Sequence, residues 1–147
     1  MSDRAQRRTR LMKLSRTVAY AVRATLQLAR DQSGSPVPCS QLAAEGNMPE
    51  RFLLQILRNL VTHGILRSTR GVDGGYSLVR QPDDISLLEI IEAIEGPIDS
   101  GEVAANPPVD EMQARLSEAL QQITSHNRRQ LEAIKVSQLL PPPPEPS

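Results

Sequence analysis

Residues 70–80 read RGVDGGYSLVR, and this stretch restricts the possible folds more than any other part of the chain. Gly71, Gly74 and Gly75 allow positive backbone φ angles, and Asp73 suits a turn. Residues 65–69 and 76–79, on either side, can each form a strand. The pattern predicts a β-hairpin whose loop is longer than two residues and therefore projects from the protein.

Two helical segments lie well before the hairpin. Apolar residues recur at helical spacing from Leu14 to Ala29, and Ser15 is placed to cap that helix. A break in the chain follows, and then a short helix is expected at 39–45. We expect Gly46 to end it in the left-handed conformation that glycine adopts readily.

A third helix is expected immediately before the hairpin, at 50–63. Pro49 suits its start, because the first turn of a helix needs no N–H at that position, and Gly64 suits its end. The order helix, short helix, turn, helix and hairpin is that of a winged helix-turn-helix. In that fold the helix at 50–63 can lie in the major groove of DNA, with the hairpin as the wing.

The charges are segregated although the net charge is zero. Residues 1–80 hold 13 Lys and Arg against 5 Asp and Glu, a balance of +8, whereas residues 81–147 hold 4 against 12, a balance of −8. The first part can therefore face a polyanion. The alternative, that segregated charge only aids solubility, is left open by the composition.

Composition also excludes several classes of protein. The single cysteine rules out an intrachain disulfide framework. No apolar run approaches the length of a membrane span, and no signal peptide is recognisable. No nucleophile–base pair, phosphate-binding loop or metal-ligand constellation indicates an enzyme. We therefore expect a cytosolic, non-enzymatic protein without a membrane partner or a cofactor.

Two further helices are expected after the hairpin. Ser86 and Glu89 have the S-x-x-E form of a capping box, before a helix that ends at Gly96. A long helix at 109–134 carries apolar residues along one side. These residues are Met112, Leu116, Leu120, Ile123, Leu131 and Ile134.

The segments MKLSRTVAYAVRATLQLA and PVPCSQLAAEGNMPERFLLQILRNLVTHGILRSTRGVDGGYSLVRQPDDISLLEIIEAIEG resemble the Rrf-type family of bacterial winged-helix transcriptional regulators. That family includes iron–sulfur, nitric-oxide and cysteine-metabolism regulators of the IscR, NsrR and CymR kind. The resemblance covers residues 12–96, and it departs from the usual wing at Asp73, where the family has a further glycine. It implies a homodimer joined by the long C-terminal helix.

These observations together predict a mainly α protein with a small β-hairpin: a winged helix-turn-helix plus a long C-terminal dimerisation helix. The expected divisions are a basic disordered extension at 1–11, the winged helix-turn-helix DNA-binding domain at 12–96, a loop at 97–108, a dimerisation helix region at 109–140 and a proline-rich disordered tail at 141–147.

One departure from the resemblance concerns the sensor. Cluster-binding members of the family carry three cysteines in the loop before the dimerisation helix, whereas this loop reads PIDSGEVAANPPVD and has neither Cys nor His. Thiolates hold such clusters, so we predict no iron–sulfur cluster of the family type. The only cysteine is Cys39, near a helix N-terminus. It is either a small packed residue or a redox-responsive thiol.

The candidate DNA-binding residues lie on the third helix and the wing. Arg51, Phe52 and Gln55 fall where the resembling family makes base and phosphate contacts; Arg can pair with guanine, Gln with adenine, and Phe can touch a thymine methyl. Phe52 is equally suited to the core. Arg70, at the base of the wing, is expected to meet phosphate or the minor groove.

Other residues support these contacts. Gly71, Gly74 and Gly75 are expected to let the wing backbone approach the duplex, whereas Tyr76 is expected to pack the wing onto the body. Arg16 and Arg23, on the first helix, are either phosphate contacts or part of a solvated face.

The predicted function is sequence-specific transcriptional regulation, as a repressor, by a homodimer bound to a pseudo-palindromic operator in double-stranded DNA. One alternative is a winged-helix protein-interaction module, because the nine acids between Asp83 and Glu111 suit a basic partner. Another is a redox-responsive regulator that uses Cys39. Control by a regulatory partner protein or a small ligand is also left open.

Overall fold

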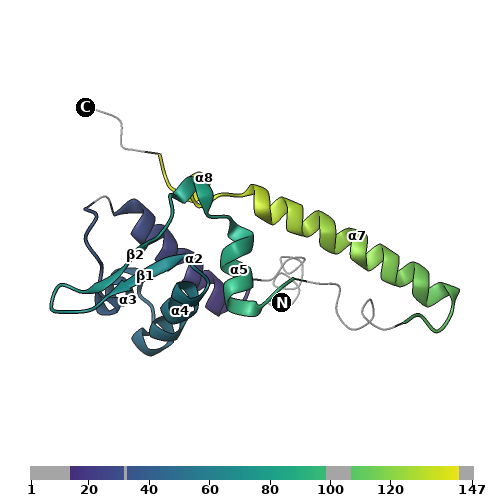
Figure 1. Cartoon of the computed structure of the whole chain (residues 1–147), viewed down its shortest axis with the longest axis horizontal. Coiled ribbons are helices and arrows are strands. Elements are labelled where there is room, and N and C mark those ends of the chain that lie inside the picture. Colours follow the sequence, from purple (N-terminus) through teal and green to yellow (C-terminus); the bar gives the residue numbers. More distant parts are fainter. Residues whose placement is uncertain (1–13, 32, 99–106, 143–147) are drawn as a thin grey trace, which may run out of the picture.

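The computed structural model describes residues 14–31, 33–98 and 107–142 (Figure 1). Its elements in chain order are α2 (Arg16–Arg30), α3 (Cys39–Gly46), α4 (Glu50–Thr62), β1 (Leu66–Thr69), β2 (Gly75–Leu78), the 3-10 turn η1 (Pro82–Asp84), α5 (Leu87–Glu95), α7 (Glu111–Ala133) and α8 (Val136–Leu139). The predicted mainly helical fold with a small hairpin is confirmed. The extension at 1–11, residues 99–106 of the predicted loop and residues 143–147 of the predicted tail lie outside the described residues.

A core between α2, α4 and α5 holds the domain together. The predicted inward face of α4 is almost fully buried; it consists of Leu53, Ile56, Leu57 and Leu60. α2 faces it with Ala21, Ala24 and Leu28, and the Ser15 hydroxyl caps α2 by accepting a hydrogen bond from the Val18 N–H at 3.1 Å. Burial of each large apolar side chain stabilises the fold by about 1.5–3 kcal/mol.

The turn between α3 and α4 corrects one prediction. Asn47, not Gly46, takes the left-handed conformation, with φ of 52°, and Gly46 is the last residue of α3. A side chain on Gly46 would overlap the methyl group of Met48 and crowd the amide of Gln27. Gly46 therefore serves close packing, and Asn47 fills the turn position because asparagine tolerates that conformation.

The wing is a two-stranded antiparallel hairpin in which Leu66 pairs with Leu78 and Thr69 with Gly75. Val37 extends it on the other edge of β2, because the Val37 N–H donates to the Tyr76 carbonyl at 2.9 Å and the Tyr76 N–H donates to the Val37 carbonyl at 2.8 Å. The Tyr76 side chain packs against the core, as predicted. The wing is thus fixed to the loop before α3.

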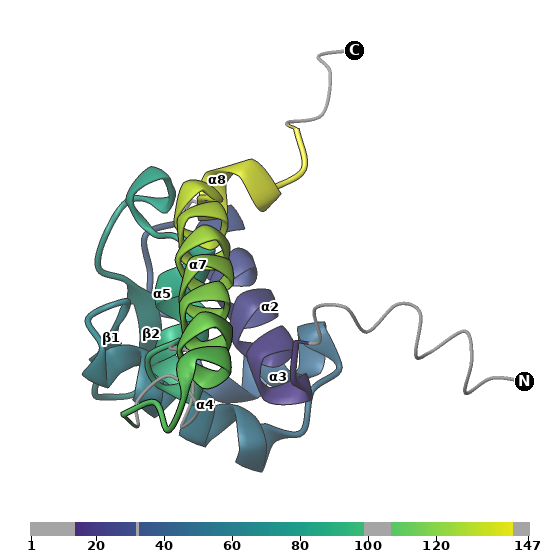
Figure 2. The same ribbon diagram turned by 90° about the vertical axis from the view of Figure 1, so that its right-hand side faces the viewer.

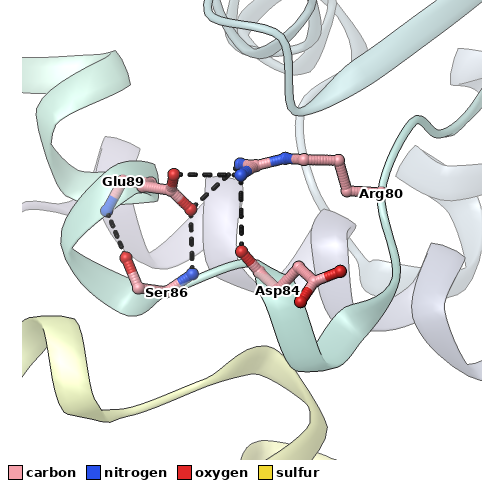
Figure 3. A network of polar contacts seen from close by, with 4 residues as sticks. All are labelled: Arg80, Asp84, Ser86 and Glu89. Carbon is pink, nitrogen blue, oxygen red and sulfur yellow. Dashed lines mark hydrogen bonds and ion pairs between the residues drawn. The ribbon is translucent and has the colours of Figure 1, made fainter.

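The start of α5 has the predicted capping box (Figure 3). The Ser86 hydroxyl accepts from the Glu89 N–H at 3.1 Å, and a Glu89 carboxylate oxygen accepts from the Ser86 N–H at 3.0 Å. The same carboxylate pairs with Arg80, at 2.9 Å between Nη2 and Oε2. One carboxylate therefore satisfies a helix terminus and holds the segment that leaves the wing.

The long helix predicted at 109–134 is present as α7 (Glu111–Ala133), and a short helix that was not predicted follows it. α7 begins after the N-cap Asp110, ends at Ala133 and extends well beyond the other helices (Figure 1). In the view of Figure 2, α7 lies in front of the domain. The chain then returns to the body, where the short helix α8, which the sequence pattern did not indicate, places Val136 in the main core. No described helix is both long and apolar enough to cross a membrane.

The Glu89 carboxylate should make the stability of the protein depend on pH. Burial opposes its ionisation, but the hydrogen bonds from Arg80 and the Ser86 N–H outweigh burial and lower the pKa of Glu89. A carboxyl with a lowered folded-state pKa contributes stability above its unfolded pKa of about 4.3, and the contribution is lost as the pH falls through the folded-state value. We therefore expect Glu89→Gln to be less stable than the wild type at pH 7.

Thermal melts between pH 7 and pH 3 test this prediction. The wild type should lose more melting temperature than Glu89→Gln as the pH falls, so that the two curves converge at the acidic end. Glu118→Gln, at an exposed position of α7, is the matched control and should follow the wild-type curve. Parallel curves for wild type and Glu89→Gln at all pH values would contradict the assignment.

Candidate nucleic-acid interface

The face of α4 opposite its buried stripe carries the predicted side chains. Arg51 and Gln55 are both exposed, one helical turn apart, and Arg58 continues the same face. Gln55 donates from Nε2 to Asn59 Oδ1 at 3.3 Å, which orients its amide along the helix. Two guanidinium groups and an amide in one row supply the donors and acceptors that base edges and phosphates recognise.

Phe52 belongs to this face and not to the core. It is the only phenylalanine in the chain, and 66% of its surface is exposed. It borders a hollow of about 80 Å³ whose lining also includes Arg16 and Tyr20 from the start of α2. The fold therefore brings Arg16 beside the start of α4, although the two residues are far apart in the sequence.

The wing places Arg70 differently from the predicted base of the hairpin. The last paired residues are Thr69 and Gly75, so Arg70 lies beyond the ladder, at the tip, where it is exposed. Arg67, exposed on β1, lies nearer the body. The two cations therefore lie at different distances from the body along the wing.

Close contacts within the fold explain why glycine occupies two of the three wing positions. A side chain on Gly75 would overlap the Val37 carbonyl, which approaches because Val37 pairs with Tyr76. A side chain on Gly74 would overlap the Thr69 carbonyl in the turn. Gly71 has φ of 116° and open space around it. Their predicted contribution to a close approach to the duplex stays a prediction.

Several acids are neutralised away from α4 and the wing. Glu89 pairs with Arg80 at 2.9 Å, Glu92 with Arg128 at 2.7 Å, and Glu111 with Arg115 at 3.0 Å. No ion pair to Arg51, Arg58 or Arg70 occurs within the described residues. The guanidinium groups of α4 and the wing tip are thus available to an anionic partner.

The structure places two arginines that the sequence analysis missed or left open. Arg58 was not selected, although its spacing of three from Gln55 and seven from Arg51 places it on their face. Arg23 was left between a phosphate contact and a solvated residue. In the structure its Nη1 donates to the Gly46 carbonyl at 2.8 Å and thereby satisfies the end of α3.

Cys39 is the first residue of α3 and is partly buried. Its Sγ lies 3.8 Å from the Glu50 carbonyl at the start of α4. Burial and, secondarily, the charge of Glu50 raise the pKa of the Cys39 thiol. A raised pKa reduces the thiolate population that reacts with oxidants, and this favours the packed role over the redox role.

The arrangement defines a class of protein: a winged helix-turn-helix with an exposed, cationic second helix and wing. Comparison with known proteins identifies the family. The model of the Rrf2 family, described as iron-dependent transcriptional regulators, matches residues 14–142. The chain belongs to the Rrf2 family of transcriptional regulators.

Individual relatives agree with this assignment. The chain is 32% identical over 114 residues to the HTH-type transcriptional regulator CymR of Bacillus subtilis, covering 76% of this chain and 83% of that protein. It is 44% identical over 89 residues to the Mycobacterium tuberculosis protein Rv1287, named as an HTH-type transcriptional regulator, covering 60% of this chain. The match spans 55% of Rv1287, about half of that relative's length.

Solved structures have the same fold. The structure of CymR, the global cysteine regulator of B. subtilis, superimposes with a TM-score of 0.72 at 28% identity, covering 88% of this chain and 96% of that one. T. potens IscR superimposes with a TM-score of 0.69 at 25% identity, covering 89% and 88%. The predicted winged-helix fold is therefore confirmed.

The residues of this chain do not fit the iron that the family description names. The chain has a single cysteine, and that residue is the first of α3. Among the described residues, no group of three or more His, Cys, Asp or Glu side chains is placed to hold a metal ion. A centre with several thiolate ligands from one subunit cannot be built from this sequence.

The position of Cys39 leads to a testable expectation. Cys39→Ser should bind DNA as the wild type does, and should leave the melting temperature within about 1–2 °C, because the thiol makes one weak contact at the edge of the core. Wild-type binding should also be insensitive to hydrogen peroxide at micromolar concentrations. A peroxide-induced change in wild-type affinity that Cys39→Ser abolishes would establish the redox alternative instead.

Proposed function

We propose that this protein is a homodimeric, sequence-specific DNA-binding transcriptional repressor that recognises a pseudo-palindromic operator. The observation that carries the proposal is the exposed cationic face of α4, held outward by the buried stripe on its other side. Family membership indicates transcriptional regulation, and the cationic face of α4 is the surface that would contact DNA. A regulator of this kind works in the compartment that holds the bacterial chromosome, so we propose the cytosol.

In this proposal α4 lies in the major groove. Arg51 and Gln55 read base edges near the start of the helix, and Phe52 contacts a thymine methyl or the adjacent sugar. Arg58 lies one turn further along and binds phosphate. Arg16, which borders the same hollow as Phe52, binds the backbone beside the groove.

The wing makes the second contact. Arg70 at its tip enters the minor groove or binds its phosphates, where a narrow groove concentrates negative potential. The glycines at 71, 74 and 75 keep side chains away from the backbone of the tip. Arg67 supports the approach from the body of the wing.

Self-association through α7 is supported by its uncovered apolar side chains. Met112, Leu116 and Ile123 are 79%, 51% and 56% exposed, and their spacing places them on one side of the helix. Such a stripe is typical of a helix that packs against another. A second copy on this face would place two α4 helices for half-sites about 34–36 Å apart, one turn of DNA.

The alternative of a protein-interaction module is less favoured by the geometry. It depended on the acids between Asp83 and Glu111, and three of the described acids in that range are paired within the chain. The cations of α4 and the wing tip, in contrast, have no anionic partner within the described residues. An unpaired cationic face favours DNA over a basic protein partner.

A DNA-selection assay on the purified full-length protein tests the function. We expect enrichment of a palindromic sequence, and we expect Arg51→Ala and Arg70→Ala each to weaken binding about 10- to 100-fold, because each removes one charge-assisted contact worth about 1–3 kcal/mol. Arg129→Ala, at an exposed position of α7, is the matched control and should bind as the wild type does.

Salt dependence separates DNA from protein partners. The logarithm of the operator affinity should fall linearly with the logarithm of the salt concentration, with a slope of about −0.9 for each phosphate contacted. Arg70→Ala should make this slope less steep by about 0.9, the value for one phosphate contact. If no sequence is enriched at low salt, the protein-interaction module becomes the better interpretation.

The dimer makes a separate prediction. Ile123→Asp should convert the protein to a monomer in sedimentation, because a charge would be buried in an apolar interface. Gln121→Asp, on the opposite side of α7, is the matched control and should leave the oligomeric state unchanged. The monomer should bind the full operator at least 10-fold more weakly, because it engages only one half-site. A wild-type monomer at micromolar concentration would contradict this part of the proposal.

A further inference from the structure

One attachment of the C-terminal segment to the domain is a short stretch of paired backbone. Residues 85–87 and 134–136 run antiparallel; the Val136 N–H donates to the Ile85 carbonyl at 2.8 Å, and the Leu87 N–H donates to the Ile134 carbonyl at 2.8 Å. We call these paired residues the clasp. The clasp joins the end of α7 to the start of α5, and both Ile85 and Val136 are buried.

Arg80 reaches the same place from the wing. Its Nη1 donates to Glu89 Oε1 at 3.1 Å and its Nη2 to Glu89 Oε2 at 2.9 Å, so the pair is bidentate (Figure 3). Nη1 also lies 3.4 Å from the Asp84 carbonyl, one residue before the clasp. The planar guanidinium matches a carboxylate in this geometry, which a lysine could not reproduce.

Because of the position of Arg80 in the chain, this pair connects the wing to α5. β2, the strand by which the chain leaves the wing, ends at Leu78, and Arg80 follows two residues later. The opposite edge of β2 is held by Val37, and the Val79 N–H donates to the Ile65 carbonyl at 3.1 Å. The Val37 contact fixes the wing to the loop before α3, and the Val79 bond continues the hairpin towards the end of α4. The Arg80 pair is the polar attachment of this segment to α5.

We propose that Arg80 is a positioning residue for DNA binding. By pairing with Glu89 it holds the wing in the orientation from which Arg70 reaches the duplex, and it joins that orientation to the clasp at the end of α7. The inference rests on the proposed function, since it assigns a role in the contact made by the wing. In a dimer joined through α7, the same attachment sets how the two wings are placed relative to each other.

Three substitutions separate this role from a general effect on folding. Arg80→Gln removes the guanidinium. Glu89→Gln removes the charge partner but keeps an oxygen that can accept from the Ser86 N–H, since glutamine also serves in a capping box. Ser86→Ala weakens the cap of α5 and leaves both members of the ion pair in place, so it is the control for lost helix stability.

The experiment measures affinity and base preference of full-length variants on the selected operator, well below their melting temperatures. We expect Arg80→Gln and Glu89→Gln each to weaken binding about 5- to 10-fold, and the double variant to be no more than about 2-fold weaker than either, because both remove one interaction. The loss should fall on the base pairs nearest the wing, with the preference at the positions read by α4 unchanged. Ser86→Ala should keep the wild-type affinity.

A second measurement does not depend on DNA. Amide hydrogen exchange at residues 70–75 should be at least 3-fold faster in Arg80→Gln than in the wild type, with Arg80→Lys between them. If Arg80→Gln binds poorly because it folds poorly, the comparison of amide exchange in Arg80→Lys with the wild type still tests the proposal, since Arg80→Lys preserves the charge.

The outcomes distinguish the two proposals. If the wild type binds its operator and Arg80→Gln binds it with the same affinity, the positioning role is overturned and the proposed function stands. The same holds if the losses of the two single variants multiply in the double variant. Absence of any selected operator for the wild type would overturn the proposed function itself. Unchanged amide exchange in the wing of Arg80→Gln would overturn the positioning role in either case.

Discussion

The arrangement of the molecule depends on the burial of one face of α4. Leu53, Leu57 and Leu60 are completely buried and Ile56 nearly so, in contact with α2, α5 and β1. Removing one such side chain typically costs about 2–5 kcal/mol. Because a helix has two opposite faces, burial of this stripe determines which residues point outward. The exposure of Arg51, Gln55 and Arg58 is therefore a consequence of the core.

The segregation of charge along the sequence acquires a structural explanation. Several acids of the second half neutralise arginines that attach the wing and α7 to α5, as in the pairs of Arg80 with Glu89 and of Arg128 with Glu92. The cations on α4 and at the wing tip have no such partners among the described residues. A net charge of zero for the whole chain thus coexists with a face suited to a polyanion.

Much of the fold could be predicted because its determinants are local. The spacing of apolar residues located α2 and α4, Ser15 and Ser86 located helix starts, and the glycines after Arg70 located the hairpin. α8 could not be predicted, since four residues are too few to show a helical period. The exchange of roles between Gly46 and Asn47 depends on packing by Met48, from the following turn, and Gln27, from another helix.

The candidate site was predictable in part. Chemistry and resemblance selected Arg51, Gln55 and Arg70 from the sequence, and the structure leaves all three exposed, while their contacts with DNA stay predictions. The exposure of Phe52 depends on how α2 meets α4, which the sequence does not state. The tip position of Arg70 depends on the strand register, and the bond from Arg23 to Gly46 joins residues 23 positions apart.

Backbone amide resonances recorded during titration with the selected operator test the central claim most directly. The account predicts that the largest shifts occur at residues 50–58 of α4 and 70–74 of the wing, with smaller shifts near Arg16 and none along the acidic part of α5. Shifts concentrated on α5 and α7, with α4 and the wing tip unchanged, would contradict it.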